Sequence, residues 1–379
     1  MKKLLIMLLC CALTLGLCSL ALAEDVPATE GVGTSYTFRL NGTNTSFYNT
    51  AFAFVQFDAD GKIVDAYVDV LEIADPTVTM ASCPRYAVVG QTMDWYDLET
   101  KEVKQVEVTK EMADELVSTW RTKRERGTEY GMGGAGEWYQ QMDAYQEFFK
   151  GKTVDELKAW EATLDENGKP VDAVSGATMS VNDAHSNILA AIYKAWDNRT
   201  EYVPCEKEGY GFTYTFRLNG TNTSFYNVAF SRVKLDAEGK IVDNYEDVLE
   251  IADPTVSMAS CPRYAVVGDT MNWNDLTAGE TKATEITTEA AQELVAAWRT
   301  KRERGTEYGM GGAGEWFEQM NAYQTFFNGK TAEELKTWGE TGLDENGKPV
   351  DAISGATMSI NDAHSDILGA VLKACENAK

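Results

Sequence analysis

The chain has 379 residues, a formal net charge of −25, 44% hydrophobic residues and nine tryptophans. This length allows two or three domains, and the apolar content excludes an intrinsically disordered chain. The strong negative charge repels nucleic acid and anionic membranes, so we expect no nucleic-acid partner.

Residues 1–23 have the pattern of a secretory signal peptide. Two lysines precede an apolar run, and small residues of the kind found at cleavage sites end it at Ala23. The run is too short for a membrane anchor. A lipoprotein signal would carry a small residue before Cys18, where this chain has Leu17. We therefore expect cleavage after Ala23 and a protein that is secreted or held at the extracellular surface.

The rest of the chain is a duplication. Tyr36–Asn49 recurs letter for letter as Tyr214–Asn227, and Arg121–Trp138 recurs as Arg299–Trp316. The repeat is longer than the units of about 20–50 residues found in solenoids, so it predicts two tandem homologous domains. The predicted segments are a first domain at 31–199, a short linker at 200–209 and a second domain at 210–379.

Within each unit, strand patterns precede helix patterns. Ala59-Asp60-Gly61 is turn chemistry between two β-rich runs and predicts a hairpin. Thr153 and Glu156 form a capping box, which predicts the start of a helix. The predicted elements of the first unit are strands at 35–40, 48–58, 62–73 and 102–108, an irregular stretch at 74–100, and helices at 109–126, at 137–150, after 153 and at about 180–197. This order predicts an α+β fold in which each domain packs an antiparallel sheet with helices.

Four cysteines follow the predicted signal, and they allow three full pairings. Cys83 and Cys261 are equivalent and are interpreted as buried thiols. Cys205 and Cys375 have no counterpart in the first unit, so we predict a disulfide between them that ties the linker to the last helix. Two histidines are too few for a histidine-rich metal site, and we expect no metal.

The segment Asp172–Ser180 (DAVSGATMS) recurs as Asp351–Ser359 (DAISGATMS). Ser180 begins a capping-box pattern, which predicts a helix starting at or just after it. Thr178 is then expected just ahead of a helix N-terminus, where free amides and the helix dipole favour an anion. Gly176 allows the backbone to approach a ligand closely. A structural turn before a helix is the alternative interpretation.

The pattern Asp-x-x-Ser-Gly-Ala-Thr resembles the flavinylation motif of the FMN-binding domain family, which occurs in the C subunit of sodium-translocating NADH:quinone reductase and the G subunit of Rnf complexes. In that family a flavin transferase joins FMN to the final threonine through a phosphoester. The resemblance implies two covalent FMN groups, on Thr178 and Thr357, and transferase recognition of the aspartates. The implied cofactor-binding residues are Asp172, Ser175, Gly176, Ala177 and Thr178 in the first unit, and Asp351, Ser354, Gly355, Ala356 and Thr357 in the second.

Three further groups of side chains have two interpretations each. His185 and His364 are expected on the same helix face as the threonines, either near the flavin or filling the seam between helix and sheet. The basic run Arg121–Arg126 either neutralises a phosphate or docks an anionic donor, or it is a solvated helix end. Aromatic residues either shield a flavin ring or, for most of them, form core: Trp120, Trp138, Tyr139, Tyr145, Phe148 and Phe149.

The tandem arrangement is similar to the flavoproteins of Gram-positive extracellular electron transfer. It implies an exported bacterial flavoprotein that passes electrons from a membrane donor to an extracellular acceptor, with a flavin transferase as maturation partner. No nucleophile–base pair is evident, so we expect an electron carrier more than an enzyme. The alternative is a secreted binding or surface protein that uses the same fold with non-covalent or no flavin.

Overall fold

The fold is built on two antiparallel sheets of long strands. The computed structural model describes residues 26–379 except 43–44, 311 and 313, so the predicted signal peptide lies outside the described residues. The strand order is β3-β2-β1 in the first repeat and β11-β10-β9 in the second. These strands are β1 Thr29–Asn41, β2 Thr45–Phe57, β3 Ile63–Ala74, β9 Lys207–Asn219, β10 Thr223–Leu235 and β11 Ile241–Ala252. The predicted hairpin and the antiparallel pairing are confirmed.

Short strands complete the β structure. β8 (Thr200–Glu201) pairs with β1 at the edge of the first sheet. Among the described residues, four small hairpins stand apart from the two large sheets, and β4 falls in the stretch predicted to be irregular. Their strands are β4 Thr92–Asp97 with β5 Glu102–Glu107, β6 Asn182–Asp183 with β7 Ser186–Asn187, β12 Thr270–Asp275 with β13 Glu280–Glu285, and β14 Asn361–Asp362 with β15 Ser365–Asp366.

In each repeat the helices follow the three long strands. They are α2 Lys110–Ser118, α3 Lys123–Arg126, η2 Gly127–Tyr130, α4 Trp138–Phe149, α5 Val154–Glu161 and α6 Ile188–Asp197, then α7 Thr288–Ala296, α8 Lys301–Arg304, η3 Gly305–Tyr308, α9 Trp316–Phe327, α10 Ala332–Thr341 and α11 Ile367–Asn377. The capping box at Thr153 is confirmed. The helix predicted over 109–126 is interrupted, because Thr122 and Glu125 form a capping box that starts a new helix.

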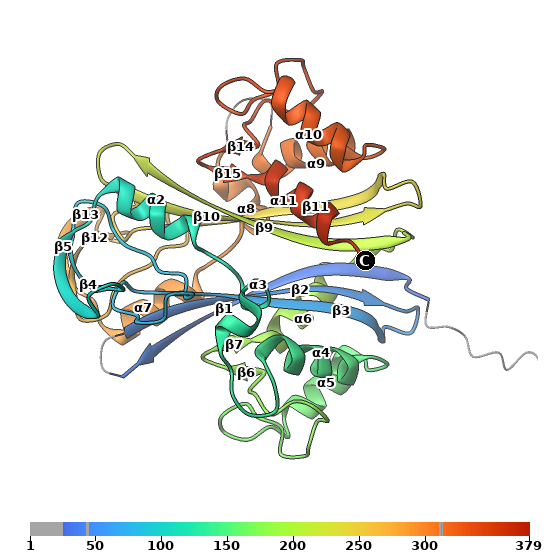
Figure 1. Cartoon of the computed structure of the whole chain (residues 1–379), viewed down its shortest axis with the longest axis horizontal. Helices are drawn as coiled ribbons and strands as arrows, with labels where there is room; N and C mark the ends of the chain where they lie inside the picture. The colour runs from blue at the N-terminus through green and yellow to red at the C-terminus, as the bar shows by residue number, and fades with distance from the viewer. Residues whose placement is uncertain (1–25, 43–44, 311, 313) are drawn as a thin grey trace, which may run out of the picture.

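Each sheet separates two hydrophobic layers. Side chains alternate along β2, so Phe52 packs toward the second sheet while Val55 packs toward the helices. β10 repeats the pattern with Phe230 and Val233. Figure 1 shows α4, α5 and α6 on the outer side of the first sheet and α9, α10 and α11 on the outer side of the second. The result is a helix–sheet–sheet–helix arrangement, which confirms the predicted α+β class.

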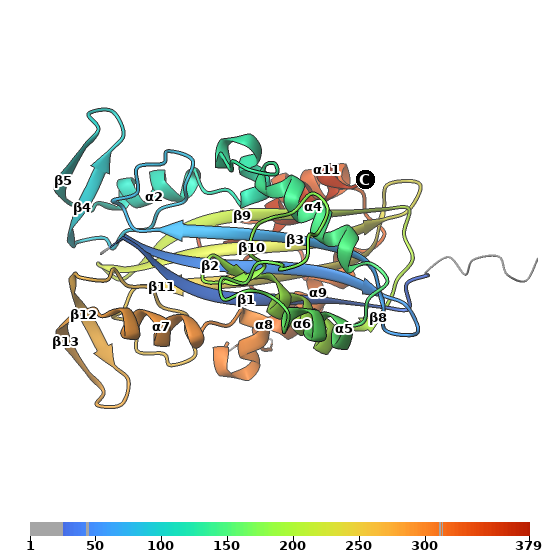
Figure 2. The same cartoon turned by 90° about the horizontal axis from the view of Figure 1, so that it is seen from below.

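The two repeats exchange helices. α2 of the first repeat packs on β9 of the second, and α7 packs on β1. Figure 2 shows these helices with the β4–β5 and β12–β13 hairpins at one end of the molecule. Tyr48 stacks on Trp298 with ring centroids 5.2 Å apart, and Trp120 stacks on Tyr226 at 5.1 Å. The hydroxyl of Tyr48 donates to the Ala265 carbonyl at 2.9 Å. The repeats therefore share one buried core.

The last helix of each repeat lies directly against the first strand of its sheet. A Cβ added at Gly33 would stand 2.0 Å from the Ala191 carbonyl oxygen, and one at Gly211 would stand 2.1 Å from the Ala370 oxygen. Only a residue without a side chain allows this approach, so these glycines set the distance between sheet and helix.

Charged side chains make the seam between the sheets asymmetric. Lys234 and Arg232 of the second repeat both pair with the buried carboxylate of Glu30, with the Arg232 Nη1 atom 3.2 Å from it. The first repeat has Gln56 and Phe54 at the corresponding positions. The pairing therefore joins the two repeats in one particular orientation.

The predicted linker is largely part of this seam. β8 takes up Thr200 and Glu201, and β9 already begins at Lys207. The Nζ atom of Lys234 donates to the Val203 carbonyl at 2.8 Å. The domain boundaries at 199 and 210 stay predictions, but the segment between them packs against both repeats.

Candidate functional site

The Ser-Gly-Ala-Thr segment forms a tight turn at the surface. The Ala177 amide donates to the Val174 carbonyl at 3.1 Å, which closes the turn. Gly176 has φ 83°, in the left-handed region that turns of this kind reserve for glycine, and Gly355 has φ 84°. Ala177 is buried, whereas Thr178 beside it is exposed. The turn is thus anchored by its alanine and presents its threonine outward.

Helix α4 holds the backbone on which Thr178 stands. The side-chain oxygen of Gln141 accepts from the Thr178 amide at 2.9 Å, from the Thr178 hydroxyl at 3.2 Å and from the Met179 amide at 3.1 Å. The hydroxyl of Tyr145, one helical turn further along, donates to the Met179 carbonyl at 2.6 Å. Gln141 was missed from the sequence; the available signal was a polar residue within the apolar face of an amphipathic helix.

The helix expected at Ser180 begins later in the chain. α6 starts at Ile188, and Asn187 is its N-cap, with its side-chain oxygen accepting from the Ala190 amide at 2.9 Å. The intervening residues form the β6–β7 hairpin instead. Thr178 therefore does not lie at a helix N-terminus, and the predicted contribution of the helix dipole is wrong.

The histidines lie in the turns of the small hairpins. Asp183 accepts from the His185 amide at 2.8 Å and lies 2.9 Å from its Nδ1 atom. Burial opposes ionisation of Asp183, but the bonds from His185 lower its pKa below the usual range. His364 and Asp362 make the same contact, and both imidazoles are 58% exposed. The predicted position on a helix face shared with the threonines is wrong. The interpretation that the histidines fill the space between helix and sheet is also wrong, because the hairpin places the rings at the surface.

A cavity of about 270 Å³ lies beside Thr357. Three basic side chains line it: Lys301, Lys348 and His364. The rings of Tyr308 and Trp316 also line it. His364, which one interpretation placed near the flavin, does line the cavity, whereas Lys348 and Tyr308 were not named from the sequence.

Lys301 is a buried cation at this cavity. Its side chain is 2% exposed, and its Nζ atom lies 3.8 Å from Glu250. Burial opposes the charge, but Tyr308 and Glu250 outweigh it and raise the pKa of Lys301. Lys123 of the first repeat has the same burial and a pKa raised by Tyr130 and Glu72 against the same opposition. The second repeat therefore holds a positive charge beside its threonine segment, and the first repeat has the same buried lysine.

Only part of the basic run is a solvated helix end, with the Arg121 side chain 39% exposed. Lys123 and Arg126 are 2% exposed, so that interpretation is wrong for them. The capping box at Thr122 turns these two side chains inward toward Glu72. Arg124 pairs with Asp143 at 2.7 Å.

The aromatic side chains are mostly core, as interpreted. Trp120 lies in the core shared by the repeats, and three others lie in the layer between the first sheet and its helices, namely Trp138, Tyr145 and Phe149. Tyr139 and Phe148 are partly buried against that layer. Trp316, the counterpart of Trp138, also lines the Thr357 cavity.

The remaining predicted site residues lie at the surface of the same turns. Asp172 and Ser175 are exposed, and so are Asp351 and Ser354. Ala356 is buried like its counterpart. The structure therefore brings each predicted set together on one exposed loop, with the alanine as the anchor.

The predicted disulfide is not present, since Cys205 and Cys375 are both free. Cys375 packs on the hydrophobic layer of the second repeat, whereas Cys205 lies beside Tyr202, so the two thiols have different surroundings. Cys83 and Cys261 are buried free thiols, as interpreted, and burial raises the pKa of each to about 12.

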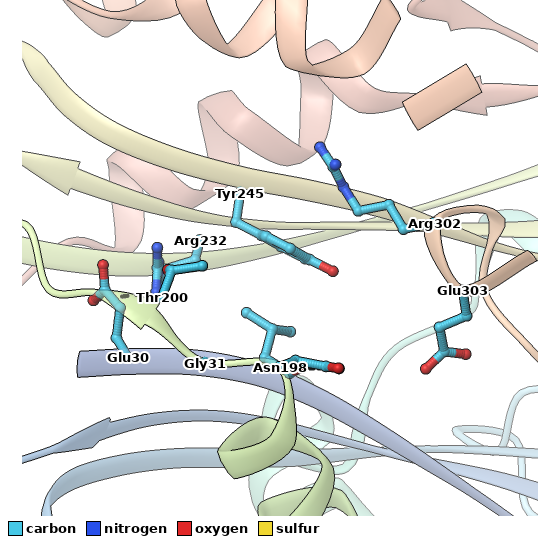
Figure 3. A pocket seen from close by; sticks show the side chains of 9 residues that line it. Glu30, Gly31, Asn198, Thr200, Arg232, Tyr245, Arg302 and Glu303 are labelled. Carbon is cyan, nitrogen blue, oxygen red and sulfur yellow. Dashed lines mark hydrogen bonds and ion pairs between the residues drawn. The ribbon is translucent and has the colours of Figure 1, made fainter. Parts of the chain in front are cut away.

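A separate cavity of about 210 Å³ lies at the seam between the repeats. Figure 3 shows Arg232 beside Glu30 at one end and Glu303 at the other. The hydroxyls of Thr34 and Tyr36 each donate to Glu303 at 3.0 Å. These polar groups are engaged in contacts between the repeats, and the cavity is lined by none of the predicted site residues.

Across residues 26–379, with the gaps given above, no group of three or more histidine, cysteine or acidic side chains is placed to hold a metal ion. In the same part of the chain, no helix is both long and apolar enough to span a bilayer.

Comparison with known proteins gives one informative similarity. The chain is 29% identical over 208 residues to a protein named chlorophenol reductase from Desulfitobacterium hafniense, a match that covers 45% of this chain. The match takes in 58% of the relative, so this chain spans less than two thirds of that protein's length. No family model and no solved structure matches the chain. Part of this chain is therefore similar to part of a reductase.

Proposed function

We propose that this chain is an exported flavoprotein that carries FMN as a phosphoester on Thr178 and Thr357. It passes electrons from a membrane donor to an extracellular acceptor. The observation that carries the proposal is the exposed Thr357 side chain at a cavity lined by Lys301, Lys348 and His364. A threonine used only for packing would be buried like the alanine before it.

The lining suits the parts of FMN. In the phosphoester to threonine the FMN phosphate keeps one negative charge at neutral pH, and lysine side chains offset that charge most strongly where water is scarce. Lys301 is buried at this cavity and Lys348 lines it. Tyr308 and Trp316 offer aromatic surface to a flat ring system. At about 270 Å³, the cavity is slightly smaller than the roughly 300–1,000 Å³ typical of ligand pockets. Part of the cofactor would therefore extend beyond it.

The hydrogen bonds at Thr178 prepare its oxygen for modification. The hydroxyl donates to the Gln141 side-chain oxygen at 3.2 Å. Because its proton is engaged there, the oxygen lone pairs face away from the helix. Asp172 and Ser175 are exposed on the same loop, where a modifying enzyme has access. Once attached, FMN supplies the redox chemistry and the protein supplies attachment and orientation.

The similarity to a reductase agrees with a redox role. It supports neither a particular substrate nor the phosphoester, because it covers 45% of this chain. The proposal of covalent FMN therefore depends on the threonine segment and its surroundings.

Intact-mass spectrometry of protein co-expressed with a flavin transferase tests the proposal. We expect the mass to increase by two FMN units, and Thr178→Ala and Thr357→Ala each to remove one. Thr128→Ala, which changes an exposed threonine outside the segment, is the control and should keep both. A colourless protein without added mass would contradict the proposal and support a secreted binding protein instead.

A further inference from the structure

A second cavity of the first repeat, of about 420 Å³, is lined by Tyr130, Gly131 and Met132. The same segment of the second repeat, Tyr308 and Met310, lines the Thr357 cavity. This part of the two repeats is identical in sequence. The same short segment therefore borders one kind of cavity in the first repeat and the other kind in the second.

The larger cavity has one charged wall and one apolar wall. Arg39 and Glu72 form the charged wall, and their side chains are 14% and 5% exposed. Phe47 and Val78 form the apolar wall. The Arg39 guanidinium carbon lies 3.6 Å from the Phe47 ring centroid, so the cation is also held by an aromatic face.

Positive charge is in excess around this wall. Glu72 lies 2.9 Å from Arg39, 3.9 Å from Lys123 and 3.6 Å from Arg126. Burial opposes ionisation of Glu72, but the cations outweigh it and lower its pKa, so the carboxylate is charged. One negative charge therefore faces three positive ones inside a chain whose formal net charge is −25. A neighbouring carboxylate, Asp75, already accepts from the Ser46 and Thr77 backbone amides.

Several donors of the cluster lack acceptors. Among the described residues, the Nε atom of Arg39 and the Nε and Nη1 atoms of Arg126 are buried without a hydrogen-bond partner. Buried N–H groups are normally paired, and buried charges are normally balanced. Arg39 lines the cavity, so an anionic acceptor there would supply a partner for the Arg39 guanidinium and negative charge for the cluster.

We infer that the Arg39 guanidinium in this cavity binds the flat, electron-rich edge of a small molecule. That edge consists of carboxylate or carbonyl oxygens. The planar fork of arginine matches such an edge, and about 420 Å³ is within the range of small-ligand sites. The edge belongs either to a free carboxylate or to the ring of the proposed FMN, and the second source rests on the proposed function. The second repeat has the same cluster, with Arg217 2.9 Å from Glu250 and its Nε atom also unpaired.

Calorimetric titration of benzoate, a flat carboxylate, into protein made without a flavin transferase tests the site. We expect saturable binding, weakened about tenfold or more by combined Arg39→Lys and Arg217→Lys, which keep the charge but remove the fork. Arg121→Lys with Arg299→Lys is the control, because those arginines pair with exposed glutamates. Circular dichroism establishes that each variant is folded.

A second pair of variants covers the case in which the arginine variants do not fold. Thr79 is exposed and lines the cavity, and Ser257 is its counterpart. Thr79→Trp with Ser257→Trp should fill the openings and abolish benzoate binding without touching the charges. Absence of benzoate binding to the parent protein, or binding unchanged in folded Arg39→Lys/Arg217→Lys protein, overturns the inference.

Repeating the titration on protein shown by mass to carry FMN distinguishes the two sources. Loss of benzoate binding on loading assigns the site to the edge of the flavin ring, and unchanged binding assigns it to a free anion. If no FMN is attached, the proposed function fails, while the titration of flavin-free protein still decides the anion site.

Discussion

Glu246 provides a quantitative test of the structure, because it is a buried carboxyl group that is only partly compensated. It lies on β11 with its side chain fully buried. One oxygen accepts from the Ser231 hydroxyl at 3.2 Å, and the other has no hydrogen-bond partner among the described residues. The first repeat has Val68 at the same place. The duplication thus supplies a natural comparison for the charged residue.

Burial raises the pKa of Glu246 from 4.5 to about 7, against the opposing charge of Arg302. The folded protein therefore binds this proton more tightly than the unfolded chain does. The resulting stability is fully present below about pH 4.5 and is lost as the pH rises through about 7. At about 1.4 kcal/mol per pKa unit, the loss is roughly 3 kcal/mol.

Glu246→Gln removes the titration at nearly constant shape. The free energy of unfolding, from urea denaturation at pH 5 and pH 8, should rise in the variant relative to the parent by up to roughly 3 kcal/mol between the two conditions. Glu246→Val, which copies Val68, should follow the same trend, and Glu238→Gln at an exposed turn should not. A variant-minus-parent difference that stays constant over this range, or falls, would refute the conclusion that burial raises the pKa of Glu246.

Three further substitutions test the packing and the site. Gly33→Ala should lower the free energy of unfolding by about 1–3 kcal/mol or more, because its Cβ would stand 2.0 Å from a helix carbonyl oxygen. Thermal unfolding measures this loss, and Gly133→Ala is the control, because a Cβ at Gly133 meets no described atom within 4 Å. Gly176→Ala places a side chain at φ 83°, so we expect a cost of about 1–2 kcal/mol and slower FMN attachment, measured by intact mass over time. Gln141→Met removes the acceptor shared by Thr178 and its neighbour, which should destabilise the protein by about 1–3 kcal/mol and reduce attachment at Thr178 but not at Thr357.

Local patterns were predictable where a few neighbouring residues decide the conformation. The hairpin around Asp60 and the helix capped by Thr153 both follow from such residues, and both are confirmed. The prediction that a helix starts just after Thr178 was wrong, because more than one residue after Thr178 is of a type that can cap a helix. Asp183 closes a hairpin turn through the His185 amide, and Asn187 then caps the helix. The same residue types serve both purposes, and only the surrounding packing selects between them.

The disulfide prediction failed for a related reason. Cys205 and Cys375 are the cysteines without counterparts in the first repeat, but the lack of counterparts does not show how far apart the two thiols lie. Their side chains lie against different neighbours, so the repeat pattern could not establish that they meet.

The amino-acid sequence by itself determined the duplication, the hairpin around Asp60 and the helix capped by Thr153, because these depend on repetition and on the preferences of a few neighbouring residues. Only the tertiary structure decided that α2 lies on the sheet of the other repeat, that Lys123 and Arg126 surround a buried Glu72, and that Gln141 holds Thr178. These contacts join residues far apart in the chain. They are selected by packing and by the cost of burying polar groups, which no local pattern contains.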